Sequence, residues 1–260
     1  MNQEKLNGIT SWVNAWAACG THPGLACGIW KNGKEVHYCE ANHKNSHMIS
    51  RDALYRIYSM TKPVTIVAAL ILIERGLLSL EDTIEKYIPS FANPQVFTGG
   101  TVEEPEVIPA NRSITVKDLM MHTSGITYLF GTSVPDHIIK SQSKDEVHWY
   151  HNTQLKDLCE YIAKAPLMFH PGEKWHYGFN TDIIGRIIEI ISNQTLDEFF
   201  TTEIFQPLSM NSTDFYVNQE NASRLVSCYA QGPNQSFVDI SAFPERNRDI
   251  ANKGKVLLSG

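Results

Sequence analysis

Three segments of the chain carry apolar side chains at helical spacing. The first lies between residues 3 and 18, and its apolar positions are Leu6, Ile9, Trp12, Val13 and Trp16. This spacing predicts an amphipathic helix packed on a sheet. The run from Val64 to Ile73 predicts a long apolar helix, and the isoleucine-rich segment from Asp182 to Ser192 predicts another.

Two short apolar segments near the N-terminus predict strands. They span residues 24–30 and 35–40, with Asn32-Gly33 between them. An Asn-Gly pair between two such runs is a strong signal of a β-hairpin. A two-stranded sheet is rarely complete by itself, and the strands that would extend it are not obvious further along the chain.

The rest of the chain predicts short helices separated by loops. We expect a short helix within 77–89, a surface loop over 91–112, a helix from Ile114 to Met121 capped by Ser113 or Thr115, and a loop with short helical pieces over 131–153. Further helices are expected from Gln154 to Lys164 and from Leu196 to Ile204, with mainly loop and weak strand signals beyond Pro207.

This order of elements predicts one domain over residues 1–260. Within it, residues 1–76 form half of a sheet and a long helix, 77–220 form a mainly helical region, and 221–260 return irregularly towards the sheet. A chain of 260 residues is long enough to bury a substantial core.

Composition narrows the class of protein. Hydrophobic residues make up 42% of the chain and charged residues 19%, which is ordinary for a globular protein. A net charge of −6 without a Lys/Arg cluster argues against a nucleic-acid partner. The longest apolar run, Val64 to Ile73, is too short to span a bilayer, so we expect no transmembrane segment. The first residues lack the pattern of a signal peptide, which predicts a cytoplasmic location.

Cysteine and histidine spacing gives no metal or disulfide framework. The five cysteines, an odd number, predict free thiols in a reducing compartment; they are Cys19, Cys27, Cys39, Cys159 and Cys228. His148 and His151 would need a third ligand to hold zinc, and no neighbour offers one. We therefore interpret them as surface histidines and expect no metal and no cofactor.

Ser59 and Lys62 are the first candidates for chemistry. Ser59 comes where the long apolar helix begins, and Lys62 follows three residues later, on the same helical face. A serine hydroxyl becomes a nucleophile when a nearby base takes its proton, and the S-x-x-K spacing supplies an amine for this. The structural alternative is a helix N-cap beside a solvated lysine. A second S-x-x-K at Ser141–Lys144 has no apolar helix behind it, so we interpret it as coincidence.

Further motifs line up behind Ser59-Met60-Thr61-Lys62. Leu119-Met120-Met121-His122-Thr123-Ser124-Gly125-Ile126 comes next, then Pro171-Gly172-Glu173 and Tyr177, with Asp182-Ile183-Ile184-Gly185 close behind. Together these motifs resemble the β-lactamase-like serine hydrolase family, which includes class C β-lactamases, D-amino-acid peptidases and β-lactamase-like esterases. The resemblance covers essentially the whole chain.

The resemblance implies both a fold and a site. The fold is α/β (α+β): an antiparallel sheet, incomplete in this chain, with flanking helices beside a mainly helical inserted domain. Tyr177 matches the family's second catalytic element, so the resemblance implies that it shares the proton transfers with Ser59 and Lys62. His122 to Gly125 match a family motif that we interpret as a structural turn; a catalytic base at His122 is the alternative.

Two departures from the family pattern shape the functional prediction. Phe179 stands where the Y-x-N motif has asparagine, and Asn180 comes one residue late. We place both among the substrate-binding residues and favour ester over β-lactam hydrolysis. The family's Lys/His-x-Gly strand is absent before Gly260, so we expect a truncated chain that lacks one oxyanion donor and has little activity alone.

The sequence therefore predicts a serine hydrolase that acts on small carboxylic esters or related amides through an acyl-enzyme. One alternative is a catalytically impaired binding or scaffold protein of the same fold. Another is a true β-lactamase or D-amino-acid peptidase in a full-length form. An uncovered sheet edge also predicts self-association.

Overall fold

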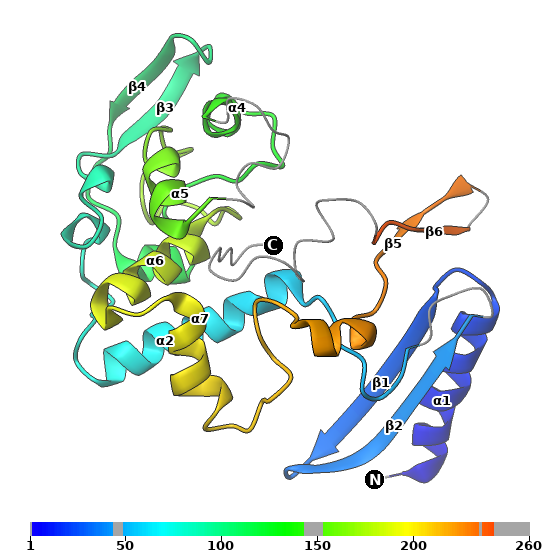
Figure 1. Cartoon of the computed structure of the whole chain (residues 1–260). Coiled ribbons are helices and arrows are strands. Elements are labelled where there is room, and N and C mark those ends of the chain that lie inside the picture. The colour runs from blue at the N-terminus through cyan, green and yellow to red at the C-terminus, as the bar shows by residue number, and fades with distance from the viewer. Residues whose placement is uncertain (1, 44–48, 143–152, 234–235, 242–260) are drawn as a thin grey trace. The chain divides into compact units, whose positions relative to one another are not determined.

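The computed structural model describes residues 2–43, 49–142, 153–233 and 236–241 (Figure 1). These residues divide into two compact units. The first contains the described residues of 2–56 and 216–241, and the second contains those of 57–215.

In the first unit, one helix packs along a β-hairpin. Helix α1 (Gln3–Ala18) lies against strands β1 (Gly24–Lys31) and β2 (Lys34–Asn42), which pair antiparallel (Figure 1). Asn32 and Gly33 both have positive φ, as the tight turn between two twisted strands requires. The predicted helix and hairpin are confirmed.

The chain returns to this unit after residue 215. Here lie the 3₁₀ helix η6 (Gln219–Arg224) and the short antiparallel strands β5 (Tyr229–Gln231) and β6 (Phe237–Asp239). Leu54 N donates to Arg224 O at 2.8 Å, and Val226 N donates to Leu54 O at 3.0 Å. These bonds join the segment after β2, which contains Leu54, to the segment that returns after residue 215.

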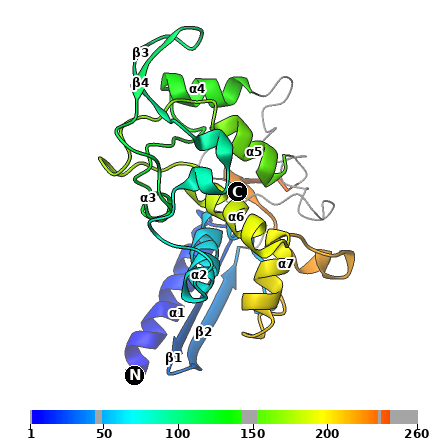
Figure 2. The same cartoon turned by 90° about the vertical axis from the view of Figure 1, so that its left-hand side faces the viewer.

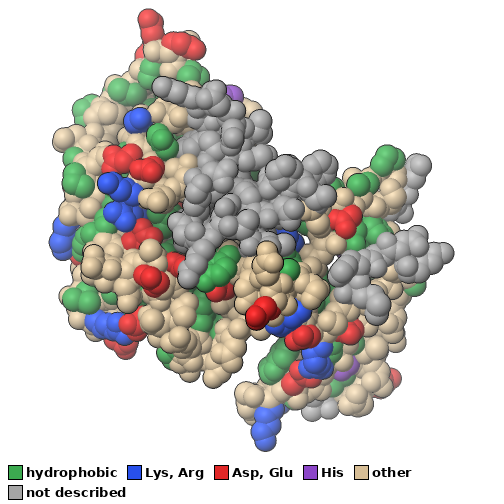
Figure 3. All heavy atoms as spheres, in the orientation of Figure 1, with side chains coloured by type: hydrophobic (Ala, Val, Ile, Leu, Met, Phe, Trp, Pro, Cys, Tyr) green, Lys and Arg blue, Asp and Glu red, His purple; other side chains and the backbone are tan. Residues whose placement is uncertain are grey.

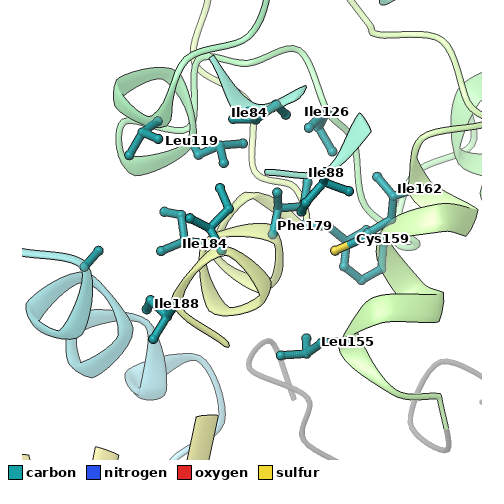
Figure 4. Packing of buried hydrophobic residues seen from close by; sticks show 14 of the residues in the cluster. Ile84, Ile88, Leu119, Ile126, Leu155, Cys159, Ile162, Phe179, Ile184 and Ile188 are labelled. Atoms are coloured by element: carbon teal, nitrogen blue, oxygen red, sulfur yellow. The ribbon is translucent and has the colours of Figure 1, made fainter. Parts of the chain in front are cut away.

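The second unit is built around helix α6 (Asn180–Ser192) (Figure 2). The helices that pack on α6 are α2 (Thr61–Glu74), α3 (Val116–Met120), α5 (Leu155–Ile162) and α7 (Leu196–Phe200). Ile183, Ile184, Ile187 and Ile188 of α6 are at most 1% exposed, and Figure 4 shows the core around Ile184 and Ile188. Each buried side chain of this size contributes roughly 1.5–3 kcal/mol, so the isoleucine-rich pattern fixes α6 at the centre.

The unit also contains several shorter elements. They are the 3₁₀ helices η1 (Tyr58–Met60), η2 (Ile84–Lys86) and η3 (Pro89–Phe91), helix α4 (Val134–Ser141) and the π-helix η5 (Thr201–Phe205). Thr115, not Ser113, caps α3, because its hydroxyl accepts from Asp118 N at 3.2 Å. Of the second S-x-x-K, only Ser141 and Gln142 lie within the described residues; Ser141 Oγ donates to Ile138 O.

The predicted surface loop over 91–112 is wrong. Strands β3 (Gln95–Gly100) and β4 (Pro105–Pro109) form an antiparallel hairpin there. A register shift between Phe97 and Gly99 breaks the regular alternation of the strand. Phe97 N also donates to Leu167 O at 2.9 Å, a partner distant in sequence. The tertiary pairing therefore forms a strand that the Gly- and Pro-rich sequence does not indicate.

The surface of the molecule is mixed in charge on the face that Figure 3 shows, where acidic side chains gather at the tip of the β3–β4 hairpin. Glu103, Glu104 and Glu106 are the exposed acidic residues of this tip. Among the described residues, no helix is both long enough and apolar enough to cross a membrane.

Candidate active site

Ser59 lies on a strained turn directly before a helix. It is the central residue of η1, and α2 begins two residues later at Thr61. Tyr58 has a φ of 43°, an unusual backbone conformation for a bulky residue that costs on the order of 1–3 kcal/mol. The turn presents Ser59 at the exposed surface of the unit, at the helix N-terminus.

Lys62 lies in the first turn of α2, one turn beyond Ser59. Its side chain is largely buried, and the residue is only 9% exposed. Lys62 Nζ donates to Ser59 Oγ at 3.3 Å. The three-residue spacing therefore brings the amine and the hydroxyl together, as expected from the sequence.

Tyr177 reaches the same hydroxyl from the segment before α6. Its OH lies 2.8 Å from Ser59 Oγ, and Lys62 Nζ lies 5.0 Å from the centre of its ring. The neighbouring Gly178 allows this approach, because a Cβ at residue 178 would lie only 2.1 Å from Ile126 O. The structure thus brings Ser59, Lys62 and Tyr177 together around one hydroxyl oxygen.

The turn that precedes Tyr177 is fixed by two backbone hydrogen bonds. Gly172, with a φ of 86°, donates its N–H to Thr123 O at 2.7 Å, and His176 N donates to His122 O at 2.9 Å. The Pro-Gly-Glu turn is therefore held against the loop after α3. The Pro171-Gly172-Glu173 motif and the motif from His122 to Gly125 are therefore neighbours in space.

Phe179 and Asn180 do not share this surface position. Both are fully buried, and Phe179 belongs to the apolar core. Asn180 Oδ1 accepts from Ser124 Oγ at 2.5 Å, and its Nδ2 lies 3.1 Å from His122 Nδ1. Substrate binding by these two residues stays a prediction, and their burial does not favour it.

Aromatic rings surround Tyr177. His122 stacks on it with ring centroids 5.5 Å apart and an angle of 4° between the planes. Tyr128 meets it edge-on at 5.5 Å. Burial, and then the charge of Lys62, lower the pKa of the His122 imidazole, so the ring is neutral near pH 7.

Sequence reasoning did not single out Tyr128 and did not connect His122 with Asn180. The aromatic segment Tyr128-Leu129-Phe130 after Gly125 was the available signal for an aromatic wall. Within the described residues, no group of three or more His, Cys, Asp or Glu side chains is arranged to hold a metal ion. His148 and His151 lie outside the described residues.

Comparison with known protein families shows the family of this chain. The β-lactamase family model matches residues 13–251, and the chain belongs to that family. The resemblance inferred from the motifs is confirmed.

Two curated relatives carry esterase names. Lovastatin esterase of Penicillium rubens is 36% identical over 187 residues, which is 70% of this chain and 45% of the relative. Esterase EstB of Burkholderia gladioli is 32% identical over 178 residues, covering 67% of this chain and 42% of the relative. The chain thus spans less than half the length of these two relatives.

The chain shares its fold with solved structures, of which EstCE1 is an example. The chain matches EstCE1, described as a hydrolase with promiscuous acyltransferase activity, with a TM-score of 0.72 and 22% identity. The match covers 92% of this chain and 58% of that one. The predicted fold class, a mixed α and β fold of the β-lactamase/transpeptidase type, is confirmed.

Proposed function

We propose that this chain is a serine hydrolase that acts on carboxylic esters or related amides through an acyl-enzyme at Ser59. The observation that supports this most directly is the position of Ser59 Oγ, within hydrogen-bond distance of Lys62 Nζ and of Tyr177 OH. A serine hydroxyl needs such a neighbour to accept its proton. The esterase names of the two relatives agree with this reaction class.

The proposed reaction has two halves. In the first, Tyr177, as a phenolate paired with the Lys62 ammonium, takes the proton of Ser59 Oγ, which attacks the carbonyl carbon. The carbonyl oxygen becomes an oxyanion, for which the Ser59 backbone N–H at the helix N-terminus is one donor. The bond to the leaving group then breaks, and the leaving oxygen or nitrogen takes the proton back from the pair.

The second half regenerates the enzyme. A water molecule gives a proton to the same pair and attacks the acyl carbon. The bond from that carbon to Ser59 Oγ breaks, Oγ recovers the proton, and the carboxylic acid leaves. The net reaction consumes one water molecule for each ester bond and changes no oxidation state, so it needs no external reductant or oxidant.

Esters suit this site better than β-lactams. In the β-lactamases of the family, the asparagine of Y-x-N helps to orient the substrate amide, and Phe179 occupies that position here inside the core. Asn180 already pairs with Ser124 and His122. Cleavage of nitrocefin at a rate similar to p-nitrophenyl butyrate would instead favour the β-lactamase or D-amino-acid peptidase alternative.

Covalent labelling tests the nucleophile even when turnover is slow. We expect a fluorophosphonate probe to form one adduct on Ser59, located by mass spectrometry, and Ser59→Ala to abolish it. Ser141→Ala, in the second S-x-x-K, is the matched control and keeps full labelling. If the folded wild-type protein forms no adduct, the binding or scaffold alternative replaces the enzyme.

A cytoplasmic location also stays a proposal. Cys19, Cys27, Cys39 and Cys159 are free thiols in the structure, which agrees with a reducing compartment. Fractionation of cells that express the tagged protein tests this, and recovery from a secreted fraction would contradict it.

A further inference from the structure

His122 occupies a conformation that needs support from its neighbours. Its φ is 55°, in the left-handed region that is unfavourable for an L-residue with a large side chain. The residue follows α3, and its carbonyl accepts from His176 N at 2.9 Å. Backbone and side chain are therefore both held, the backbone by the Tyr177 segment and the side chain by Asn180.

The hydrogen bonds of Ser124 determine how the Asn180 amide is oriented. Ser124 Oγ is fully buried, accepts from Ile126 N at 3.0 Å and lies 2.5 Å from Asn180 Oδ1. Its own proton needs an acceptor, and the amide oxygen supplies one. With the amide turned around, the buried hydroxyl would face two donors and lose that acceptor, which is costly.

The Asn180 amide in turn fixes the tautomer of His122. Because its oxygen faces Ser124, its Nδ2 donor faces His122 Nδ1 at 3.1 Å. Nδ1 must then accept, so the ring proton lies on Nε2. The imidazole is anchored at one nitrogen, in a plane almost parallel to the ring of Tyr177.

We propose that His122 is a positioning residue for Tyr177, held as the neutral Nε2–H tautomer by the Ser124–Asn180 pair. The face of the imidazole limits the tilt of the Tyr177 ring, while Tyr128 meets that ring edge-on. A tyrosine ring turns about its Cβ–Cγ axis without moving its hydroxyl, but a tilt moves the hydroxyl directly. The stack therefore keeps Tyr177 OH at 2.8 Å from Ser59 Oγ.

This inference rests on the proposed function, and two substitutions separate its components. His122→Asn tolerates the left-handed backbone and keeps an oxygen acceptor for Asn180, but it removes the stacked ring. His122→Phe keeps a ring for stacking, but it leaves the buried Asn180 Nδ2 without its acceptor. A positioning role predicts that kcat falls about tenfold in His122→Asn with KM unchanged, and that His122→Phe recovers most of kcat despite a lower unfolding midpoint.

A purely structural role predicts the opposite order, with kcat following stability. That order, or an unchanged kcat in His122→Asn, would overturn the proposal. His137→Asn, on the exposed side of α4, is the matched control and leaves kcat, KM and unfolding midpoint as in the wild type.

A measurement independent of activity separates this inference from the proposed function. In ¹⁵N-histidine-labelled protein at pH 7, the ring nitrogen shifts of His122 are expected to show a deprotonated Nδ1 and a protonated Nε2. Asn180→Asp replaces the amide donor by a carboxylate acceptor and should move the proton to Nδ1. The ring protons of Tyr177 should lose their ring-current shift in His122→Asn. A protonated Nδ1 in the wild type, or unchanged Tyr177 shifts, would refute the proposal even in a protein without hydrolase activity.

Discussion

Tyr177 OH and Ser59 Oγ lie 2.8 Å apart although 118 positions separate the two residues in the chain. The helix that carries Lys62 and the turn before α6 are packed in the same unit, so this distance depends on its core. Replacing Tyr177 by Phe removes one hydroxyl and keeps the ring.

Tyr177→Phe is therefore expected to lower kcat/KM about 10²–10⁴-fold, the range for losing a general acid–base group. The ring contacts with His122 and Tyr128 remain, so the thermal unfolding midpoint should stay near that of the wild type. Hydrolysis of p-nitrophenyl butyrate with a parallel melting curve tests both expectations. Undiminished hydrolysis would remove Tyr177 from the mechanism.

Lys62→Met tests the amine. Methionine has a similar unbranched side chain and fits an environment in which only 9% of the residue is exposed. We expect the rate of fluorophosphonate labelling at Ser59 to fall at least about 10²-fold, with a change in unfolding free energy below about 1.5 kcal/mol. Lys117→Met, whose side chain is 55% exposed, is the control and should label normally.

Part of the free energy of unfolding is expected to depend on pH through the carboxyl group of Asp118. Burial opposes its ionisation, but hydrogen bonds from Arg112 at 2.6 and 2.8 Å and from Thr115 outweigh it, so the pKa of Asp118 is lowered. A lowered folded-state pKa stabilises the protein above the unfolded value of about 3.9. That contribution is lost as the pH falls through the folded pKa.

Asp118→Asn should therefore cost about 1–3 kcal/mol at pH 7, because a neutral amide replaces the buried carboxylate that accepts from Arg112 and Thr115. The difference from wild type should shrink as the pH falls below about 4. Urea unfolding of both proteins at pH 7 and below about pH 4 measures this difference in free energy. Glu81→Gln, in an exposed pair with Lys117 at 4.0 Å, should change the free energy by less than about 1 kcal/mol. An equal loss at both pH values would contradict the assignment.

Gly178→Ala is expected to damage stability and activity together. The new Cβ would lie 2.1 Å from Ile126 O and 2.9 Å from Thr127 O, so the backbone must shift next to Tyr177. We expect a loss of about 1–3 kcal/mol and slower labelling of Ser59. Gly8→Ala, in α1 with nothing within 4 Å, should instead stabilise by about 0.4–1 kcal/mol. A well-folded, fully active Gly178→Ala protein would contradict the close approach.

Self-association is the last expectation. Among the described strands, β1 and β2 pair only with each other, and unpaired strand edges favour pairing between chains. Light scattering after size exclusion should show species larger than the 29.3 kDa chain, increasing with protein concentration. A constant monomer mass across the accessible concentrations would contradict this.

Local patterns predicted the parts of the structure that depend on neighbours in sequence. The spacing of Ser59 and Lys62 required only a helical turn, and the Asn32-Gly33 turn required only two flanking strands. The β3–β4 hairpin depends on pairing with Leu167, so its own sequence did not reveal it. The approach of Tyr177 to Ser59 was inferred only through the family resemblance.

Burial of polar groups was the hardest feature to predict. Asn180 begins an apolar helix, and its place beside the Y-x-N position led to the prediction that it binds substrate. The structure shows that Ser124 and His122 satisfy its amide inside the protein. Such pairing depends on three segments that meet only in the folded unit, so the pattern of apolar residues along the sequence does not reveal it.

Ser59, Lys62 and Tyr177 all belong to the unit formed by residues 57–215. All three reacting groups therefore depend on the folding of this one unit.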